Sequence, residues 1–484
     1  MDNNVNEKET LLKVEHLCQY FKLGSSTLKA VNDVSFDIKK GEVFGLVGES
    51  GCGKTTTGRS IIKLYNCTSG DVYFDGKRIC AGTLSYKQEE KAAVKAFLAD
   101  LKKSMKKGEE KPDLKASFRR MFDVIKEQQK NIRKANHDQK RCDRDYAKGE
   151  VAKVREEYKP KFAKIDKKSK EYTKLLWEYL KALRLARKTR LVTKIQMVFQ
   201  DPIASLDPRM TVREIIAEGL TIRGIRNKKV VDEKVYDVLE KVGLVREHAG
   251  RYPHEFSGGQ RQRIGVARAI IMEPELIIAD EPISALDVSI QAQVINLLND
   301  LRNELGLTIL FIAHDLSVVK YFSDRIAVMY FGNMVELATS DELFAHPLHP
   351  YTRSLLSAIP LPDPVYEKQR KRIVYNPLAD HDYSVDKPSF REVEPGHFVS
   401  CNQAEFEEYV RICKGEAKPE DNTTDELVDD VQPENMAQEV IVENPVDASM
   451  EASLIRNEGT PIGDAAIVAE EVVETTEQDK NPEI

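Results

Sequence analysis

A glycine-rich octapeptide, Gly48–Thr55 (GESGCGKT), constrains the fold of this 484-residue chain more than any other feature. It follows the apolar segment Glu42–Val47 and opens a segment, Gly53–Leu64, that is predicted to be a helix. This context, a glycine loop between a buried strand and a helix, separates the GxxxxGK[ST] phosphate-binding pattern from a chance glycine turn. The sequence therefore predicts an α/β fold of the P-loop NTPase class.

The loop carries the groups that a nucleotide triphosphate needs. Its glycines let backbone N–H groups point at the phosphates, and the start of the helix adds a favourable partial positive charge. We expect Lys54 to reach the β- and γ-phosphates of ATP and the Thr55 hydroxyl to hold Mg²⁺. The residues predicted to line the nucleotide here are Gly48, Glu49, Ser50, Gly51, Cys52, Gly53, Lys54, Thr55 and Thr56.

Two carboxylates follow an apolar run further along the chain. Leu276–Ala279 reads as a buried strand, and Asp280 and Glu281 come directly after it. A parallel sheet would bring them to the same edge as the glycine loop. We expect Asp280 to bind Mg²⁺ through water and Glu281 to act as the general base that polarises the attacking water. A solvated strand end is the alternative, and the four preceding apolar residues disfavour it.

Strand-like and helix-like segments alternate along the chain, which indicates a parallel sheet covered on both faces. Two N-terminal strands are expected to form a small antiparallel sheet, and residues 211–272 are mostly helical by period. The two N-terminal strands are Leu11–Tyr20 and Leu28–Ile38. The remaining expected elements are strands at Ile195–Phe199 and Ile309–Ala313 and a helix at Val288–Leu305.

Composition limits the class of protein. No segment reaches the roughly 18–20 apolar residues needed to cross a bilayer, and the N-terminus (MDNNVNEKET) lacks the apolar core of a secretory signal. Any membrane association is therefore expected to run through partner proteins or surface charge. The seven dispersed cysteines show no metal-binding spacing and are expected to be thiols in a reducing compartment rather than a disulfide framework.

Charge is distributed very unevenly. Residues 81–190 contain 33 Lys and Arg against 17 Asp and Glu, a net charge of +16, whereas residues 415–484 contain 3 against 20, a net charge of −17. Helical spacing in the basic segment predicts two or three long amphipathic helices with breaks at Pro112 and Pro160. The acidic tail has no aromatic residue and is expected to be disordered.

The segment Ser257–Gln260 (SGGQ), followed by Arg261, resembles the signature motif of the ABC transporter ATPases. The resemblance implies that this signature contacts the γ-phosphate of an ATP held by a partner domain. The signature residues that this implies as nucleotide contacts are Ser257, Gly258, Gly259 and Gln260.

The same resemblance assigns further positions. Ser284–Asp287 (SALD) is similar to the D-loop, so Asp287 is implied at the nucleotide interface. His314 resembles the switch histidine that contacts the γ-phosphate, and Gln200 resembles the Q-loop glutamine, which contacts Mg²⁺ and responds to the membrane partner. Phe21 sits where the family places an aromatic ring on adenine; Tyr20 is the alternative, and a core role for either ring stays open.

Three longer segments resemble the oligopeptide/dipeptide importer subgroup, in particular the second ATPase subunit of the oligopeptide system. They are QDPIASLDPRMTV (Gln200–Val212), DEPISALDVSIQAQV (Asp280–Val294) and HPLHPYTRSLLSAIP (His346–Pro360). The subgroup fold is a RecA-like core, an antiparallel β lobe and a helical lobe bearing the signature. The resemblance implies a peripheral protein on the cytoplasmic face of a bacterial cell membrane.

The resemblance also implies partners. A second ABC ATPase subunit, by family precedent a paralogue, would sandwich two ATP molecules with this chain. Closure of the pair would push on two transmembrane permease subunits, and an extracellular solute-binding protein would take part indirectly.

The resemblance covers about residues 11–80 and 191–410 and divides the chain. We expect the N-terminal part of the ATPase domain at 1–83, a basic helical insertion at 84–188 and the rest of the ATPase domain at 189–335. A C-terminal extension of the oligopeptide-importer type follows at 336–414, and the acidic tail spans 415–484. The insertion departs from the subgroup, which joins Lys54 and Gln200 by a much shorter segment.

A second departure concerns cysteines. Many subgroup members carry a cysteine cluster suited to an iron–sulfur centre after the HPYTR segment, but here only Cys401 and Cys413 stand in that region. Because four thiolates are the usual requirement, the sequence predicts no iron–sulfur cluster.

The leading hypothesis is an ATPase that drives import of oligopeptides or dipeptides. The alternative is a soluble ABC ATPase that acts on nucleic acid or ribosomes through its basic insertion. It is disfavoured because chromosome-maintenance relatives place their coiled coil after the Q-loop glutamine and translation-factor relatives carry two ATPase domains. A catalytically dead subunit is disfavoured because Lys54, Asp280, Glu281 and His314 are present.

The insertion is expected either to contact an anionic membrane surface or the acidic tail, or to be a solvated hairpin.

Overall fold

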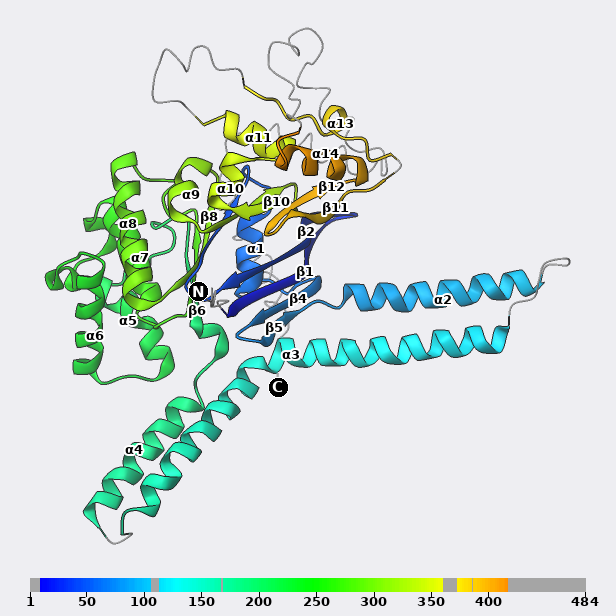
Figure 1. Cartoon of the computed structure of the whole chain (residues 1–484). Coiled ribbons are helices and arrows are strands. Elements are labelled where there is room, and N and C mark those ends of the chain that lie inside the picture. Colours follow the sequence, from blue (N-terminus) through cyan, green and yellow to red (C-terminus); the bar gives the residue numbers. More distant parts are fainter. Residues whose placement is uncertain (1–8, 106–112, 167–168, 360–371, 385, 417–484) are drawn as a thin grey trace, which may run out of the picture.

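Two β-sheets and the helices around them form the body of the protein (Figure 1). The computed structural model describes residues 9–105, 113–166, 169–359, 372–384 and 386–416. In this part a four-stranded antiparallel sheet has the order β2-β1-β4-β5, and an eight-stranded sheet has the order β11-β12-β10-β9-β3-β8-β7-β6. The strands are β1 (Thr10–Leu23), β2 (Ser26–Lys39), β3 (Val43–Val47), β4 (Ser69–Phe74), β5 (Lys77–Ala81), β6 (Ile195–Val198), β7 (Leu276–Asp280), β8 (Thr308–Ala313), β9 (Arg325–Tyr330), β10 (Asn333–Thr339), β11 (Ser389–Glu394) and β12 (His397–Cys401).

The centre of the large sheet is parallel, as the apolar runs predict: β9, β3, β8, β7 and β6 pair in parallel. All five residues of β3 are buried, because both faces of the sheet are covered. Alternate side chains go to opposite faces. Val43 and Val47 join the core under the helical lobe, whereas Phe44 and Leu46 join the core shared with the antiparallel sheet.

Helices cover the large sheet and form the lobe that carries the signature segment. Serine and threonine N-caps with capping boxes start α5 at Thr211 and α7 at Ser257. The helices of the body are α1 (Lys54–Ile61), α5 (Val212–Arg223), α6 (Lys228–Lys241), α7 (Gly258–Ile270), α8 (Val288–Leu305), α9 (Leu316–Phe322), α10 (Ser340–Ala345), α11 (Pro350–Ser357), α13 (Pro377–Asp380) and α14 (Gln403–Cys413), with 3₁₀ turns at η1 (Leu191–Lys194), η2 (Arg246–Gly250) and η3 (Pro253–Glu255).

The basic segment between β5 and β6 forms three helices, as predicted: α2 (Leu84–Met105), α3 (Leu114–Ala163) and α4 (Lys170–Ala186). The 50 residues of α3 extend about 75 Å at 1.5 Å per residue. Figure 1 shows α2 lying along the first half of α3 and α4 folded back along its end, so the segment forms two projecting arms. None of the helices in the described ranges is long and apolar enough to span a membrane.

The middle of α3 is attached to the body of the protein. Asp138 accepts hydrogen bonds at 2.9 and 2.7 Å from Nε and Nη2 of Arg78, on β5. Nζ of Lys63, just after α1, donates to the backbone oxygen of Gln139 at 2.7 Å. Tyr146 is buried in the core shared by the two sheets. Both arms therefore extend from one fixed central segment.

Three expectations need correction. Pro160 does not break α3, which continues to Ala163; a proline so near the helix end removes only one of the last backbone hydrogen bonds. Cys67 and Cys80 form a disulfide rather than two free thiols: Cys67 lies just before β4 and Cys80 lies on β5, with their Cα atoms 6.6 Å apart. The pattern also missed the antiparallel strands β10, β12 and β11 at one edge of the sheet. Pro112 and almost all of the acidic tail lie outside the described residues.

A buried carboxylate joins the C-terminal region to the sheet. Glu336, on β10, is fully buried and accepts hydrogen bonds from the backbone N–H groups of Leu348 and His349 at 2.8 and 3.1 Å. Its carboxylate also lies 2.8 Å from Nε2 of His397, on β12. These contacts fix the start of α11, which His349 caps by accepting the N–H of Tyr351.

The buried His349 makes stability depend on pH. Burial, and secondarily the neighbouring His381 and Arg353, hold the pKa of His349 well below its ordinary value near 6.5. The folded state therefore keeps His349 neutral. The contribution of the neutral His349 to the free energy of unfolding is complete above pH 6.5. It is lost as the pH falls below that value, because only the unfolded chain takes up the proton.

We predict that lowering the pH from about 7.5 to about 5.5 destabilises the wild type by about 1 kcal/mol more than His349→Asn. Asparagine retains an acceptor for the helix cap but does not titrate. Thermal denaturation of both proteins at both pH values measures the difference. Equal losses in the two proteins would exclude His349 as the source.

Candidate functional site

The glycine loop leaves the end of β3 and curls into α1, as the sequence predicts. Two of its glycines are required by close backbone approaches. A Cβ atom on Gly48 would lie 2.2 Å from the carbonyl oxygen of Met329, and one on Gly53, where φ is +102°, would lie 2.2 Å from that of Ala30. The loop is therefore pressed against β9 and β2, and only glycine fits at these two positions.

Lys54 is folded back onto the loop. Its side chain is only 3% exposed, and Nζ donates to the backbone oxygens of Gly48 and Glu49 at 2.7 and 2.8 Å. The same Nζ lies 4.0 Å from Oε1 of Glu281. The ammonium group thus sits inside the loop, between the backbone oxygens and the catalytic-site carboxylate predicted from sequence.

The carboxylates after β7 meet the loop, also as predicted. The Thr55 hydroxyl donates to Oδ1 of Asp280 at 2.7 Å, and burial raises the pKa of Asp280 although the Thr55 hydrogen bond opposes the shift. The second carboxylate oxygen, Oδ2, is buried and has no hydrogen-bond partner among the described residues. A buried carboxylate oxygen without a partner lowers the stability of the folded state unless a cation or a water molecule binds it.

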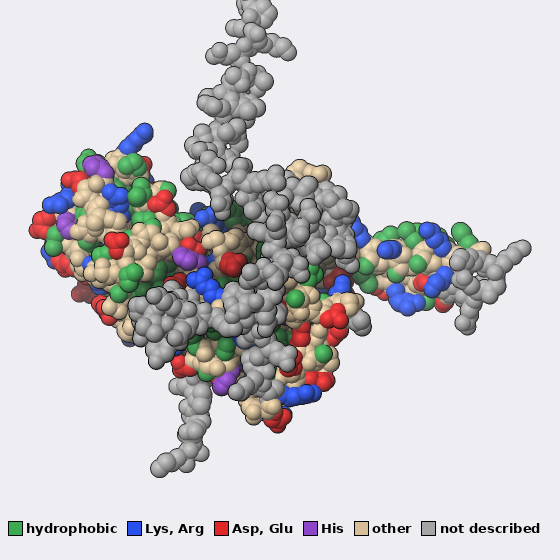
Figure 2. Space-filling model, turned by 90° about the horizontal axis from the view of Figure 1, so that it is seen from above, with side chains coloured by type: hydrophobic (Ala, Val, Ile, Leu, Met, Phe, Trp, Pro, Cys, Tyr) green, Lys and Arg blue, Asp and Glu red, His purple; other side chains and the backbone are tan. Residues whose placement is uncertain are grey.

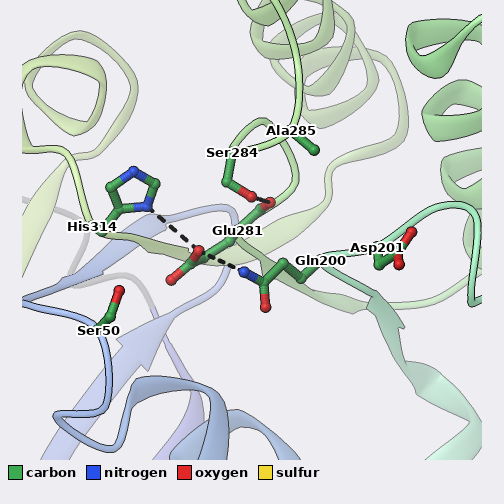
Figure 3. A pocket seen from close by; sticks show the side chains of 7 residues that line it. All are labelled: Ser50, Gln200, Asp201, Glu281, Ser284, Ala285 and His314. Atoms are coloured by element: carbon green, nitrogen blue, oxygen red, sulfur yellow. Dashed lines mark hydrogen bonds and ion pairs between the residues drawn. The ribbon is translucent and has the colours of Figure 1, made fainter. Parts of the chain in front are cut away.

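Glu281 is the centre of the site (Figure 3). Nε2 of Gln200 donates to its Oε2 at 3.0 Å, and Nδ1 of His314 lies 3.4 Å from the same oxygen. Glu281 has a φ of +43°, a left-handed conformation that is rare for a residue other than glycine, asparagine or aspartate and concentrates at functional sites. Its backbone N–H is held by the carbonyl of Ile312, on β8.

These side chains surround one cavity of about 440 Å³. Its lining comes from the glycine loop, the segment after β6, the segment after β7 and the end of β8 (Figure 3). The lining residues are Ser50, Gln200, Asp201, Glu281, Ser284, Ala285 and His314. Four segments far apart in sequence therefore line one recess.

Known proteins share these features. The family described as ABC transporter matches residues 31–157 and 154–284, and the family described as oligopeptide/dipeptide transporter, C-terminal region, matches residues 335–384. The chain is 47% identical over 402 residues to the oligopeptide transport ATP-binding protein OppF of Bacillus subtilis (strain 168). The alignment covers 83% of this chain and 99% of that protein. This chain belongs to the ABC transporter ATP-binding proteins, in the oligopeptide/dipeptide group.

A second sequence relative agrees with the assignment. The oligopeptide transport ATP-binding protein AmiF of Streptococcus pneumoniae serotype 4 is 42% identical over 404 residues, covering 83% of this chain and 98% of that protein. The solved structure of cbiO1 from Clostridium perfringens, part of the transporter complex cbiONQ, aligns with a TM-score of 0.43 at 20% identity over 70% of this chain and 92% of that chain. As a member of this family, the protein is an ATPase that binds ATP and couples its hydrolysis to transport.

The signature segment of this ABC ATPase lies away from the cavity. Ser257 caps α7 and is exposed, as is Gly258, whereas Gly259 packs against Ile290. Asp287 is exposed at the start of α8. The signature and D-loop aspartate are thus not brought to the glycine loop of the same chain, and neither lines the cavity.

The remaining predicted residues have mixed positions. Glu49 is exposed, Cys52 is buried and Thr56 is half-buried, all on the loop or the first turn of α1. The Phe21 ring stands edge-on to Tyr65 with centroids 5.3 Å apart, while the Tyr20 hydroxyl donates to Asn32 at 2.7 Å. Both rings are half-buried on β1. Because its hydrogen bond to Asn32 holds the Tyr20 hydroxyl in place, Phe21 is the better candidate of the two rings for stacking on adenine.

Sequence reasoning missed two contributors. Asp201 lines the cavity, and its position directly after Gln200 is the signal that could have found it. Tyr351, on α11, accepts a hydrogen bond from the N–H of Glu49 at 3.1 Å, and no local pattern pairs residues 302 positions apart. The described residues contain no group of three or more His, Cys, Asp or Glu side chains that could hold a metal ion. The expected lack of an iron–sulfur cluster stays a prediction.

The position of Glu281 leads to a test of its predicted role. In Glu281→Gln the amide keeps the shape and the contact with Gln200 but cannot act as a base, so we expect kcat for ATP hydrolysis to fall at least about 100-fold. ATP affinity should change little. Steady-state hydrolysis and equilibrium ATP binding measure the two effects.

Asp201→Asn is the matched control, because it neutralises another carboxylate of the same cavity. We expect a far smaller loss of kcat in this variant. Unchanged turnover in Glu281→Gln would remove Glu281 as the base.

Proposed function

We propose that this protein is the ATP-hydrolysing subunit of an importer for oligopeptides or dipeptides. The observation that carries the proposal is that one chain combines the cavity beside the glycine loop with a C-terminal region matched to the oligopeptide/dipeptide transporters at 335–384. The names of the relatives support it, because OppF and AmiF are both described as oligopeptide transport proteins. They do not favour the alternative of action on nucleic acid or ribosomes.

The proposed chemistry needs positioning and charge rather than covalent catalysis. Glu281 accepts the proton of the attacking water, while Gln200 and His314, both beside its Oε2, orient that water and the γ-phosphate. Lys54 exchanges the backbone oxygens of Gly48 and Glu49 for phosphate oxygens when ATP binds. The backbone N–H groups of the loop up to Thr56 hold the phosphates, and Phe21 stacks on adenine.

The residues present fit Mg²⁺. The buried, unpartnered Oδ2 of Asp280 and the adjacent Thr55 hydroxyl are hard oxygen donors, which Mg²⁺ prefers. We propose that Thr55, Asp280 and Gln200 hold the ion, directly or through water. When bound, Mg²⁺ would neutralise charge on the phosphates.

This assignment predicts a shift in metal dependence. Thr55→Ala removes one donor, so the Mg²⁺ concentration for half-maximal ATPase activity should rise about tenfold or more. Titration of activity with Mg²⁺ measures it. The control is Ser60→Ala, also on α1, whose hydroxyl donates to the Thr56 carbonyl within the helix. Equal Mg²⁺ dependence in Thr55→Ala and Ser60→Ala would argue against the site.

The exposed signature supports assembly with a second ATPase subunit, which we propose to be a paralogue. Ser257–Gln260 would contact the ATP of that subunit, with Asp287 beside it, and the partner's signature would complete the cavity described here. Glycine-rich N–H groups at the start of α7 suit a phosphate.

The remaining proposed partners are two transmembrane permease subunits and, indirectly, an extracellular solute-binding protein. The ATPase pair would sit on the cytoplasmic face of the cell membrane. Purification of the full chain from its native membrane in mild detergent tests this. We expect a second ABC ATPase and two multi-span proteins to co-purify. Ribosomes or nucleic acid in their place would overturn the importer assignment.

We also propose that the chain is divided into the five segments expected from its sequence, with the arms at 84–188 as an accessory to the ATPase domain. Figure 2 shows basic and apolar side chains on the arm that projects from the body. Phe118, Phe122 and Met105 there are more than half exposed. These features support contact of the insertion with an anionic surface, either membrane lipid or the acidic tail.

Removing residues 417–484 distinguishes the two contacts. If the tail occupies the arms, the truncated chain should bind phosphatidylglycerol vesicles more strongly at low salt than the full chain. Unchanged, strong binding would assign the arms to lipid alone, and no binding by either chain would leave them as a solvated hairpin.

A further inference from the structure

One peptide group of the phosphate loop is held at both ends. The carbonyl oxygen of Gly48 accepts a hydrogen bond from Nζ of Lys54 at 2.7 Å. The N–H of Glu49, which belongs to the same peptide group, donates to the hydroxyl of Tyr351 at 3.1 Å. Because a peptide group is planar, fixing its N–H also fixes the direction of its carbonyl.

Tyr351 reaches the loop from a distant part of the chain. It lies on α11, within residues 335–384 that match the oligopeptide/dipeptide C-terminal region, and it is 2% exposed. Its ring packs against Tyr330, with centroids 4.5 Å apart, and against Tyr375 at 5.5 Å. These contacts leave the hydroxyl little freedom. Burial raises the pKa of Tyr351, so the hydroxyl stays neutral.

Two further contacts on the backbone of the loop come from backbone groups elsewhere in the chain. The N–H of Gly332 donates to the carbonyl of Cys52 at 2.9 Å, and the carbonyl of Met329 lies against Gly48. Among the described residues, Tyr351 is the side chain from outside the loop that bonds to the backbone at its first turn. A single substitution at Tyr351 can therefore remove this contact with the loop backbone without altering the loop sequence.

The local backbone makes this contact matter. Gly48 has a φ of +150°, where glycine rotates more freely than other residues. Without an acceptor for the Glu49 N–H, the peptide group can turn, and the carbonyl that receives Lys54 turns with it. The exposed neighbours Glu49 and Ser50 provide no packing that would resist this rotation.

We propose that Tyr351 is a positioning residue for ATP binding. Its hydroxyl fixes the Gly48–Glu49 peptide group, keeps the loop in its phosphate-binding shape and holds the oxygen on which Lys54 rests. The C-terminal region thereby acts on the nucleotide site through one hydrogen bond. This role rests on the assignment of Gly48–Thr55 as the ATP phosphate loop.

The test compares two identical chemical changes in the full-length chain. Tyr351→Phe removes the hydroxyl that bonds to the loop, and Tyr375→Phe removes a hydroxyl from the same ring cluster that makes no hydrogen bond to the described loop. Loss of one preorganising hydrogen bond should weaken equilibrium ATP binding about three- to tenfold in Tyr351→Phe. KM for ATP should rise by a similar factor with kcat little changed. Tyr375→Phe should bind ATP as the wild type does.

Melting temperatures separate this role from a purely structural one, which would lower stability in either variant without a selective loss of ATP affinity. Wild-type affinity in Tyr351→Phe, or equal losses of affinity in both variants, would overturn the proposal. Lys54→Ala tests the underlying assignment separately. If Lys54→Ala also binds ATP normally, the phosphate loop is wrongly assigned; if only Lys54→Ala fails to bind, the loop stands and the role of Tyr351 does not.

Discussion

The parallel register of four neighbouring strands determines where the chemistry can occur. Val47, the last residue of β3, lies level with Ala313 at the end of β8, and Asp280 of β7 lies level with Ile312. Val198, at the end of β6, pairs with Ala279. Gly48, Gln200, Glu281 and His314 follow these strand ends within two residues, so the register gathers groups separated by up to 266 positions, from Gly48 to His314, at one sheet edge. A slip of one residue in the β7 pairings would turn the Asp280 side chain to the opposite face of the sheet.

Buried carboxylates have two different roles in this protein, and their hydrogen bonds tell them apart. Glu42 bonds to Arg325 and to the N–H of Lys39, and Glu336 has two backbone donors and a histidine. Both are fully satisfied and join segments of the fold. Asp280 is as deeply buried but leaves one oxygen without a partner in the described structure. A folded chain rarely retains such an oxygen unless a ligand completes it.

The sequence was sufficient for the parts of the structure that depend on local pattern. Apolar runs located β3, β7 and β8, and the glycine spacing located the loop, because each signal lies within ten residues. It failed where the contact is between distant segments. The edge strand β11 carries exposed and half-buried residues, and its neighbour β12 alternates buried with half-buried residues, so neither forms an apolar run. The Tyr351–Glu49 contact has no local signature. Pro160 misled because a proline removes one helical hydrogen bond without necessarily ending the helix, and α3 continues past it to Ala163.

The central attachment of α3 has a mechanical consequence. The helix extends about 36 Å from Asp138 to Leu114 in one direction and about 25 Å from Tyr146 to Ala163 in the other. A tilt of about 5° at the attached segment therefore displaces the far end of the longer arm by about 3 Å. Lys63, which bonds to that segment, follows the helix that begins at Lys54. Small rotations of the attached segment are thus geometrically magnified at the ends of arms tens of ångströms from the body of the protein.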